Sequence, residues 1–263
     1  PEALVPGGAG HGCGHNLLGA GCYSAAVALK DYMVENNLDG SVVFFGCPAE
    51  ETGGGKCFMA RDGIFDGVDF AISPHPFPDN GFIGRCLANM QVEYSFSGQA
   101  SHASAEPHHG RSALDAAELM NVGVNFLREH MKPKESVHYS FSDTGGISPN
   151  VVQPIAKVIY MVRSNTVRNA KILLKRVDNI AKGAALMTDT TVTCRQIDGT
   201  SDTVSNTVLE KLLYENLQQA PLPTYTAEEE AFAAALKETL FSSPSATPSP
   251  SVITRDIKDV SSA

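Results

Sequence analysis

The stretch QVEYSFSG (residues 91–98), with SALDAAELMNVGVNFLREHM (112–131) after it, is the most informative part of the sequence for the fold. Apolar and polar residues alternate in the first segment, which is typical of a strand with one wet face. In the second segment apolar residues recur at helical spacing, so we expect an amphipathic helix. The segments that follow have the patterns of two strands, a helix and a last strand, at 136–142, 153–164, 169–188 and 190–197.

The resulting order, β-α-β-β-α-β, is that of the ferredoxin-like split unit. We therefore predict a ferredoxin-like α+β domain over residues 91–200, inserted into another domain. The flanking sequence has helical patterns at 17–35 and 56–62. It also has two short apolar runs, SVVFFGC (41–47) and FAISP (70–74).

Those two runs are typical of strands buried on both faces, as in a parallel sheet covered by helices. Strands that alternate with helices indicate an α/β domain. We place its first part at residues 1–90 and its return at 201–240. Residues 241–263, which contain SSPSATPSPS, are predicted to be a low-complexity tail.

The composition excludes several classes of protein. The 263 residues are 43% hydrophobic and 19% charged, which suits a folded chain with a real core. Twenty basic and 29 acidic side chains give a net charge of -9. Nucleic-acid binders usually have a net positive charge, so this class is disfavoured. No apolar run approaches the roughly 18 residues of a membrane span. We expect neither a nucleic acid nor a membrane as partner.

The six cysteines lack the close, even spacing of a secreted disulfide scaffold. We expect most of them, with Cys13 as the exception, to be reduced, buried thiols of a cytoplasmic protein. No Cys-x-x-Cys pair accompanies Cys13, which disfavours a thiol redox protein. Pro1 stands first and no signal segment follows it, so we expect a chain that starts inside a larger protein or after processing.

Three clusters carry residues suited to chemistry: GHGCGHN (10–16), PAEE (48–51) and SPHP (73–76). The second and third directly follow the two expected buried strands. Ligands of open α/β sheets bind outside the carboxyl ends of the strands, so the clusters can converge on one rim. Thiolate, imidazole and carboxylate together are ligands for zinc and other divalent first-row metals.

Each cluster also has an ordinary interpretation. Glu50 and Glu51 can be a solvated loop pair, and His75 can be a core or surface histidine. The glycine-rich segment GGAGHGCG lacks a strict G-x-G-x-x-G motif, which disfavours its interpretation as a dinucleotide-binding loop. The joint occurrence of the three clusters favours a metal site. In such a site one of the two acids would bind the metal, and its neighbour would take a proton from metal-bound water.

Five motifs then occur in a specific order: GHGCGHNLLGAG, FFGCPAEETGGGK, ISPHP, GQASHAS with GRSALDA, and NVVQP followed by VR. Together they resemble the aminoacylase and carboxypeptidase family of dinuclear metallohydrolases, from about residue 7 to 240. The resemblance implies a metallopeptidase-type α/β catalytic domain, present in part, with the ferredoxin-like insert as a dimerisation domain. It also implies hydrolysis of the amide bond of N-acyl amino acids, an aminobenzoyl-glutamate among them.

The same resemblance implies roles for single residues. The ligands of two divalent ions, manganese or zinc, would be Cys13, His15, Glu51 and His75. Glu50 would be the general base. His102 would stabilise the oxyanion in the site of a partner chain, in a homodimer or a heterodimer. Asn150 and Arg163 would hold the substrate carboxylate, a task that suits the bidentate fork of arginine.

Without the resemblance, His102 would be interpreted as a loop histidine and Arg163 as an exposed strand residue. We expect structural or surface roles for His11, His108 and His109. The family pattern also has an upstream strand and a downstream metal-binding histidine, whereas no histidine follows His138 here. A fragment, a truncated product and an inactive relative that serves as a non-catalytic partner subunit therefore all stay open.

Overall fold

Four antiparallel strands form the largest sheet of the computed structural model, in the order β4-β6-β2-β7. The structure describes residues 5–8, 10–51, 54–76, 81–82, 86–221, 223–240 and 258–259. The chain divides into a first unit (Pro1–Cys47, Met59–Ile83 and Asn206–Ala263) and a second unit (Pro48–Phe58 and Gly84–Ser205).

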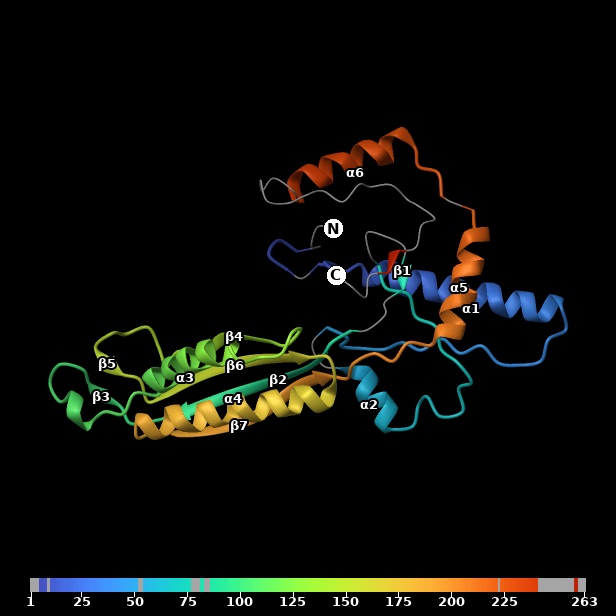
Figure 1. Ribbon diagram of the computed structural model, residues 1–263. Coiled ribbons are helices and arrows are strands. Elements are labelled where there is room, and N and C mark those ends of the chain that lie inside the picture. The colour runs from blue at the N-terminus through green and yellow to red at the C-terminus, as the bar shows by residue number, and fades with distance from the viewer. Residues whose placement is uncertain are drawn as a thin grey trace. The chain divides into compact units, whose positions relative to one another are not determined.

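The second unit contains all six elements that the sequence predicted between residues 91 and 200. Its strands are β2 (Ala88–Ser97), β4 (Ser136–Asp143), β6 (Ile155–Ser164) and β7 (Thr191–Thr200), and its long helices are α3 (Ala113–Arg128) and α4 (Val167–Met187). They follow one another as β2-α3-β4-β6-α4-β7 (Figure 1). Short elements stand between them: β3 (Ser101–His102), the 3-10 helix η1 (Pro107–His109) and β5 (Val151–Val152).

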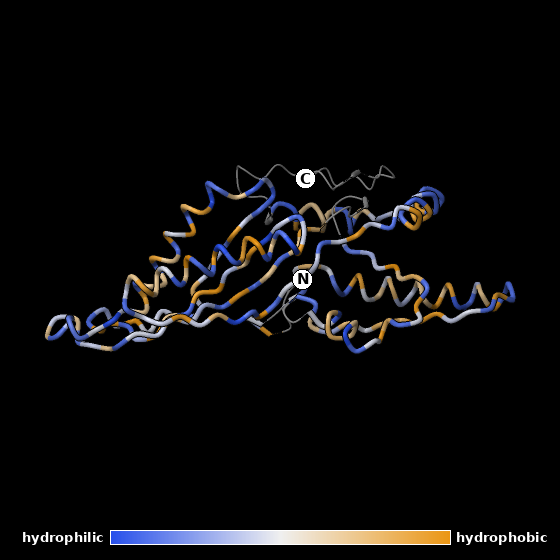
Figure 2. Tube along the Cα trace, turned by 60° about the horizontal axis from the view of Figure 1, so that its bottom comes forward, coloured by the Kyte–Doolittle hydropathy of each residue, from blue (hydrophilic) through white to orange (hydrophobic). Residues whose placement is uncertain are grey.

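Alternation along the strands decides which face is buried. Every second residue of β2 is buried and its neighbours are partly exposed, and β6 shows the same alternation. Figure 2 shows the matching change between hydrophobic and hydrophilic residues along the chain. Tyr94 lies opposite Val158 in the register of the two strands, so the buried sets share one face.

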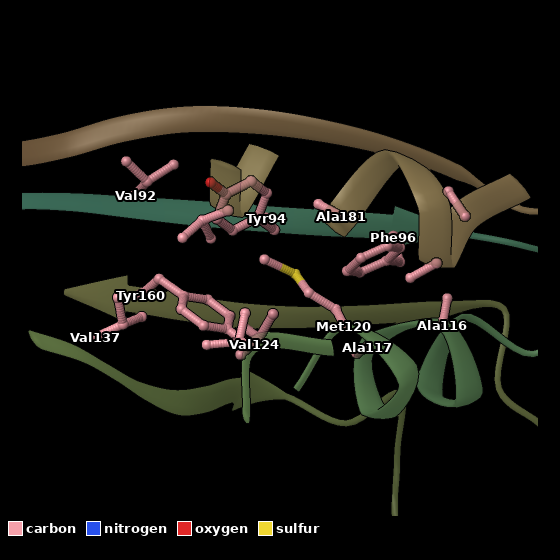
Figure 3. Close-up of a cluster of buried hydrophobic side chains, with 14 of the residues drawn as sticks. Val92, Tyr94, Phe96, Ala116, Ala117, Met120, Val124, Val137, Tyr160 and Ala181 are labelled. Atoms are coloured by element: carbon pink, nitrogen blue, oxygen red, sulfur yellow. The ribbon is translucent and has the colours of Figure 1, made fainter. Parts of the chain in front are cut away.

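The two helices close this face into a core. Alanines on α3 and α4 allow a close approach to the sheet, and Met120 fills the space between the layers (Figure 3). The helices also approach each other closely, since a Cβ on Gly123 would lie 2.6 Å from Ile180 Cγ2. Ser112 and Thr166 begin α3 and α4 as N-caps, each accepting a bond from the backbone N–H three residues on.

The first unit has a different character. Its helices are α1 (His15–Glu35), α5 (Thr207–Gln219) and α6 (Ala227–Leu240), and α2 (Gly55–Arg61) runs from the second unit's segment into it. Its one described strand pair is parallel, β1 (Gly81–Phe82) with β8 (Lys258–Asp259). No residue of α1 or α5 is buried.

The predicted buried strands at 41–47 and 70–74 are wrong. Both segments are irregular in the structure. A strand buried on both faces needs hydrogen-bonded neighbours and covering side chains. Within the described residues neither segment has a paired strand, and Phe44 and Ile72 are 48% and 58% exposed. The apolar composition reports hydrophobicity, whereas a strand also requires a partner.

The predicted burial of the cysteines is also wrong. All six are free thiols, but four are exposed and two are partly exposed. Large apolar residues near two of them are themselves exposed, namely Phe44 near Cys47 and Phe58 next to Cys57. Most of the predicted tail, including 242–251, lies outside the described residues. Among the helices that the structure describes, none combines the length and the apolar character required to cross a membrane.

Candidate metal centre

The start of α1 positions the first two predicted ligands. Gly14 is the N-cap residue and has φ 74, a left-handed conformation that glycine adopts without strain. Its carbonyl accepts bonds from the backbone N–H groups of Leu17 and Leu18. Cys13 therefore stands immediately before the helix and His15 is its first residue.

The close approach of Pro76 explains how a residue 60 positions away reaches this helix start. A Cβ on Gly14 would lie 3.1 Å from Pro76 Cβ and Cγ, so the segment that ends at Pro76 passes directly over the glycine. His75 is thereby placed beside Cys13 and His15. The glycine between the two predicted ligands thus has two functions, the left-handed turn and the space for this segment.

The three side chains form a compact donor set within the first unit. Cys13 Sγ and His75 Nε2 are 3.4 Å apart. The rings of His15 and His75 meet edge to face, with centroids 5.9 Å apart and an interplanar angle of 88°. One ligand atom from each residue lies within 4.8 Å of the other two.

This geometry fits a divalent metal ion. Zinc binds thiolate at about 2.3 Å and imidazole at about 2.0–2.1 Å, which in a tetrahedral site separates the ligand atoms by roughly 3.3–3.8 Å. The Cys13–His75 distance of 3.4 Å lies in that range. Because a carbonyl only accepts, His75 Nδ1 must donate its proton to the Pro76 carbonyl at 2.8 Å. His75 Nε2 then keeps its lone pair for a metal, as in the usual orientation of a ligating histidine.

Glu50 and Glu51 lie on a tight loop that belongs to the second unit. Ala49 has φ 52, and a Cβ on Gly55 would lie 2.1 Å from the Pro48 carbonyl oxygen, so only glycine fits where the loop closes onto α2. The two carboxylates are exposed. The loop follows an irregular segment and not the predicted strand.

His102 and Asn150 are brought together by the β3–β5 pair. His102 lies opposite Val151 in this antiparallel register, and Ala103 N–H donates to the Asn150 carbonyl at 2.9 Å. The Asn150 side chain accepts a bond from Ser148 Oγ at 2.8 Å. The sequence contains both residues in the NVVQP and GQASHAS motifs, but their adjacency depends on a ladder between segments almost 50 residues apart.

Arg163 lies at the other end of the second unit. It pairs with Asn89 and Ser136 near the end of β6, eight residues beyond Ile155. At about 3.3 Å per residue the two ends of that stretch are roughly 26 Å apart. The three residues predicted to contact substrate are therefore divided into two groups within one unit: His102 with Asn150, and Arg163.

Sequence reasoning missed the residues that orient these side chains. The Pro76 carbonyl orients His75, and Ser148 contacts Asn150. The S-x-N spacing could have indicated the second contact, because a serine hydroxyl two residues away reaches an asparagine side chain. His108 and His109, for which we expect structural or surface roles, are exposed and lie in η1 with ring centroids 4.1 Å apart.

Nearly the whole chain matches the model of a known protein family. The model of Peptidase family M20/M25/M40 matches residues 2–260. The chain therefore belongs to this family.

Two relatives compared by sequence are consistent with that membership. The B subunit of p-aminobenzoyl-glutamate hydrolase from Escherichia coli (strain K12) is 47% identical over 243 residues, 92% of this chain and 50% of the relative. Xaa-Arg dipeptidase from Mus musculus is 34% identical over 185 residues, 70% of this chain and 43% of the relative. The crystal structure of an aminobenzoyl-glutamate utilization protein from Klebsiella pneumoniae is 20% identical with a TM-score of 0.44, covering 54% of this chain and 39% of that one. The chain spans half or less of these relatives.

Proposed function

We propose that the protein is a metal-dependent amidohydrolase that cleaves the amide bond of N-acyl amino acids. The observation that carries the proposal is the convergence of Cys13, His15 and His75, with ligand atoms within 4.8 Å of one another, in a chain of a peptidase family. Cys13, His15 and His75 would hold the metal, with Glu51 as a further ligand, as the family resemblance implies. Two divalent ions, manganese or zinc, complete the proposal.

A divalent ion at this site would polarise the substrate carbonyl and lower the pKa of water. Glu50 is proposed as the general base that takes the proton of the attacking water. It then returns that proton to the leaving amine nitrogen as the amide bond breaks. The adjacent acids thus divide two tasks, since a carboxylate that binds metal is a poor proton acceptor while its neighbour stays available.

His102 is proposed to donate a hydrogen bond to the oxyanion that forms on the carbonyl oxygen. Asn150 and Arg163 are proposed to bind the substrate carboxylate. His102 is proposed to act in the site of a partner chain, and the length of roughly 26 Å along β6 separates Arg163 from His102 and Asn150 within the second unit. The second unit, proposed to be an inserted ferredoxin-like domain over about 91–200, would be the dimerisation domain.

The partner is proposed to be a second copy or a related chain, because a relative 47% identical to this chain is named as one subunit of a hydrolase. The same relative supports p-aminobenzoyl-glutamate as the substrate. We further propose that the protein works in the cytoplasm, because all six cysteines are free thiols and a reducing compartment preserves them.

The test is the release of glutamate from p-aminobenzoyl-glutamate by the protein loaded with manganese or zinc. Glu50→Gln should lower kcat by about 10²–10⁴-fold, the usual range for a general base, with the bound metal retained. Glu35→Gln, at the exposed end of α1, is the matched control and should leave kcat unchanged. Equal rates for wild type and Glu50→Gln would refute the base assignment.

Metal content separates the enzyme from a non-catalytic partner subunit. About two ions per chain, measured by elemental analysis after dialysis, supports the enzyme. No bound ion at saturating manganese or zinc would overturn the proposal and favour the non-catalytic partner.

A further inference from the structure

The ring of His102 is held by the loop that follows it. Nδ1 lies 3.3 Å from the backbone nitrogen of Ser104 and 3.2 Å from that of Ala105, and both N–H groups donate to it. Ser104 Oγ lies 3.2 Å from the same ring nitrogen. Three polar groups therefore converge on Nδ1, whereas Nε2 forms no hydrogen bond with any of the described residues.

These contacts decide where the imidazole proton lies. A backbone N–H can only donate, so Nδ1 must present its lone pair to the Ser104 and Ala105 amides. A proton on Nδ1 would face two N–H groups and lose both bonds. The neutral ring therefore carries its proton on Nε2, the nitrogen that points away from the loop contacts.

The loop itself is closed at both ends. The Glu106 N–H donates to the His102 carbonyl at 3.2 Å, and Ser101 Oγ donates to the Glu106 carbonyl. On the other side, the Ala103 N–H donates to the Asn150 carbonyl at 2.9 Å. The amides that face Nδ1 are thus fixed by bonds within a single turn and by the β3–β5 pair.

We propose that the backbone amides of Ser104 and Ala105 are positioning groups that hold His102 in the Nε2–H tautomer and present Nε2–H as a hydrogen-bond donor. Such a donor suits an acceptor that develops negative charge, and it would be lost if the proton moved to Nδ1. The use of this donor on an oxyanion rests on the proposed function. The tautomer does not, and it can be measured without substrate.

The first experiment is nitrogen NMR of the chain labelled with ¹⁵N-histidine, with the His102 signals assigned by their loss in His102→Gln. We expect the chemical shift of an unprotonated nitrogen at Nδ1 and of a protonated one at Nε2. His108 and His109, in the same segment and without a backbone N–H on a ring nitrogen among the described residues, serve as internal comparison and should average between tautomers. A protonated Nδ1, or the same averaging at His102, would overturn the proposal.

Two substitutions at one position separate the amide from the hydroxyl. Ser104→Ala keeps the backbone N–H and should keep the Nε2–H tautomer. Ser104→Pro removes the N–H and should give a mixture of tautomers. If Ser104→Pro keeps a fixed Nε2–H tautomer, the amide of Ser104 has no positioning role. If Ser104→Pro fails to fold, the wild-type spectrum still decides the proposal.

Kinetics connects the tautomer with the reaction. Ser104→Pro should lower kcat by about 10–100-fold with little change in KM, at or below the range for loss of one oxyanion donor. His109→Gln, in the same segment, should leave kcat unchanged. If NMR shows a fixed tautomer but His102→Gln leaves kcat unchanged, His102 has no role in catalysis. The positioning of its ring by the Ser104 and Ala105 amides would still stand. The two failures are therefore distinguishable.

Discussion

The two units of this chain differ in how they treat their apolar residues. In the second unit, Phe96 on β2 is fully buried between the sheet and the helices. In the first unit, Phe44 is 48% exposed and contacts Tyr23 edge to face at a centroid distance of 5.8 Å. Both segments have a strand-like sequence. Apolar residues in a strand-like pattern are therefore buried in a core only where neighbouring strands and helices cover them.

The largest expected effect contrasts these two phenylalanines. Phe96→Ala should lower the free energy of unfolding of the second unit by about 3–5 kcal/mol, because it leaves a cavity in a packed core. Phe44→Ala should cost about 1 kcal/mol or less, since one edge-to-face contact is lost at a half-exposed position. Urea unfolding followed by circular dichroism measures both. Equal losses would show that the first unit buries Phe44 as firmly as the second buries Phe96.

Metal binding at Cys13, His15 and His75 should stabilise the first unit and so bring its free energy of unfolding closer to that of the second. At a free ion concentration 100 times Kd, linkage adds about 2.7 kcal/mol to the free energy of unfolding. Zinc or manganese titration with thermal unfolding checks this. His75→Ala should remove most of the effect, because His75 Nε2 faces Cys13 Sγ at 3.4 Å. His11→Ala, an exposed histidine outside the donor set, should retain it, and a loss there would contradict the ligand assignment.

A hydrogen bond between two polar side chains inside the core of the second unit tests how much buried hydrogen bonding contributes to its stability. Tyr160 OH on β6 donates to Asn121 Oδ1 on α3 at 2.5 Å, and Asn121 is 5% exposed. Tyr160→Phe should cost about 1–3 kcal/mol, because it leaves the amide oxygen buried without its donor. The double substitution Tyr160→Phe with Asn121→Leu should recover part of that loss in urea unfolding. No recovery would mean that packing, and not the hydrogen bond, dominates.

The smallest effect is a dependence on alkaline pH. Burial raises the pKa of the Tyr94 phenol, and the hydrogen bond to Asp178 raises it further. Burial also raises the pKa of Tyr160, with a smaller contribution from Tyr139. The folded protein holds these protons more tightly than the unfolded chain, so stability is complete below the ordinary tyrosine pKa of about 10 and falls as pH rises above it.

Tyr94→Phe should reduce the slope of unfolding free energy against pH above about pH 10. Tyr225→Phe, at a position 54% exposed, is the control and should leave that slope as it is. Unfolding curves between about pH 9 and 11 measure both variants. An unchanged slope in Tyr94→Phe would show that this phenol ionises alike in the folded and unfolded chain.

Much of this protein could be predicted from its sequence because the informative signals are local. The alternation in QVEYSFSG and the helical spacing in 112–131 specify period and face, and these suffice for β2 and α3. Likewise, the residue types in GHGCGHN and SPHP are those that a divalent metal prefers as ligands, so the sequence predicts a metal site. The family motifs then ordered these pieces without any knowledge of distance.

Features that depend on partners far along the chain could be read only from the folded molecule. Residues 41–47 are irregular among the described residues, since pairing is a property of two segments. Cys13 comes to within 3.4 Å of His75 through the space that Gly14 leaves for Pro76. Likewise, His102 Nδ1 turns toward two amides. Residue identity determines which groups are available, but their distance and orientation follow from packing.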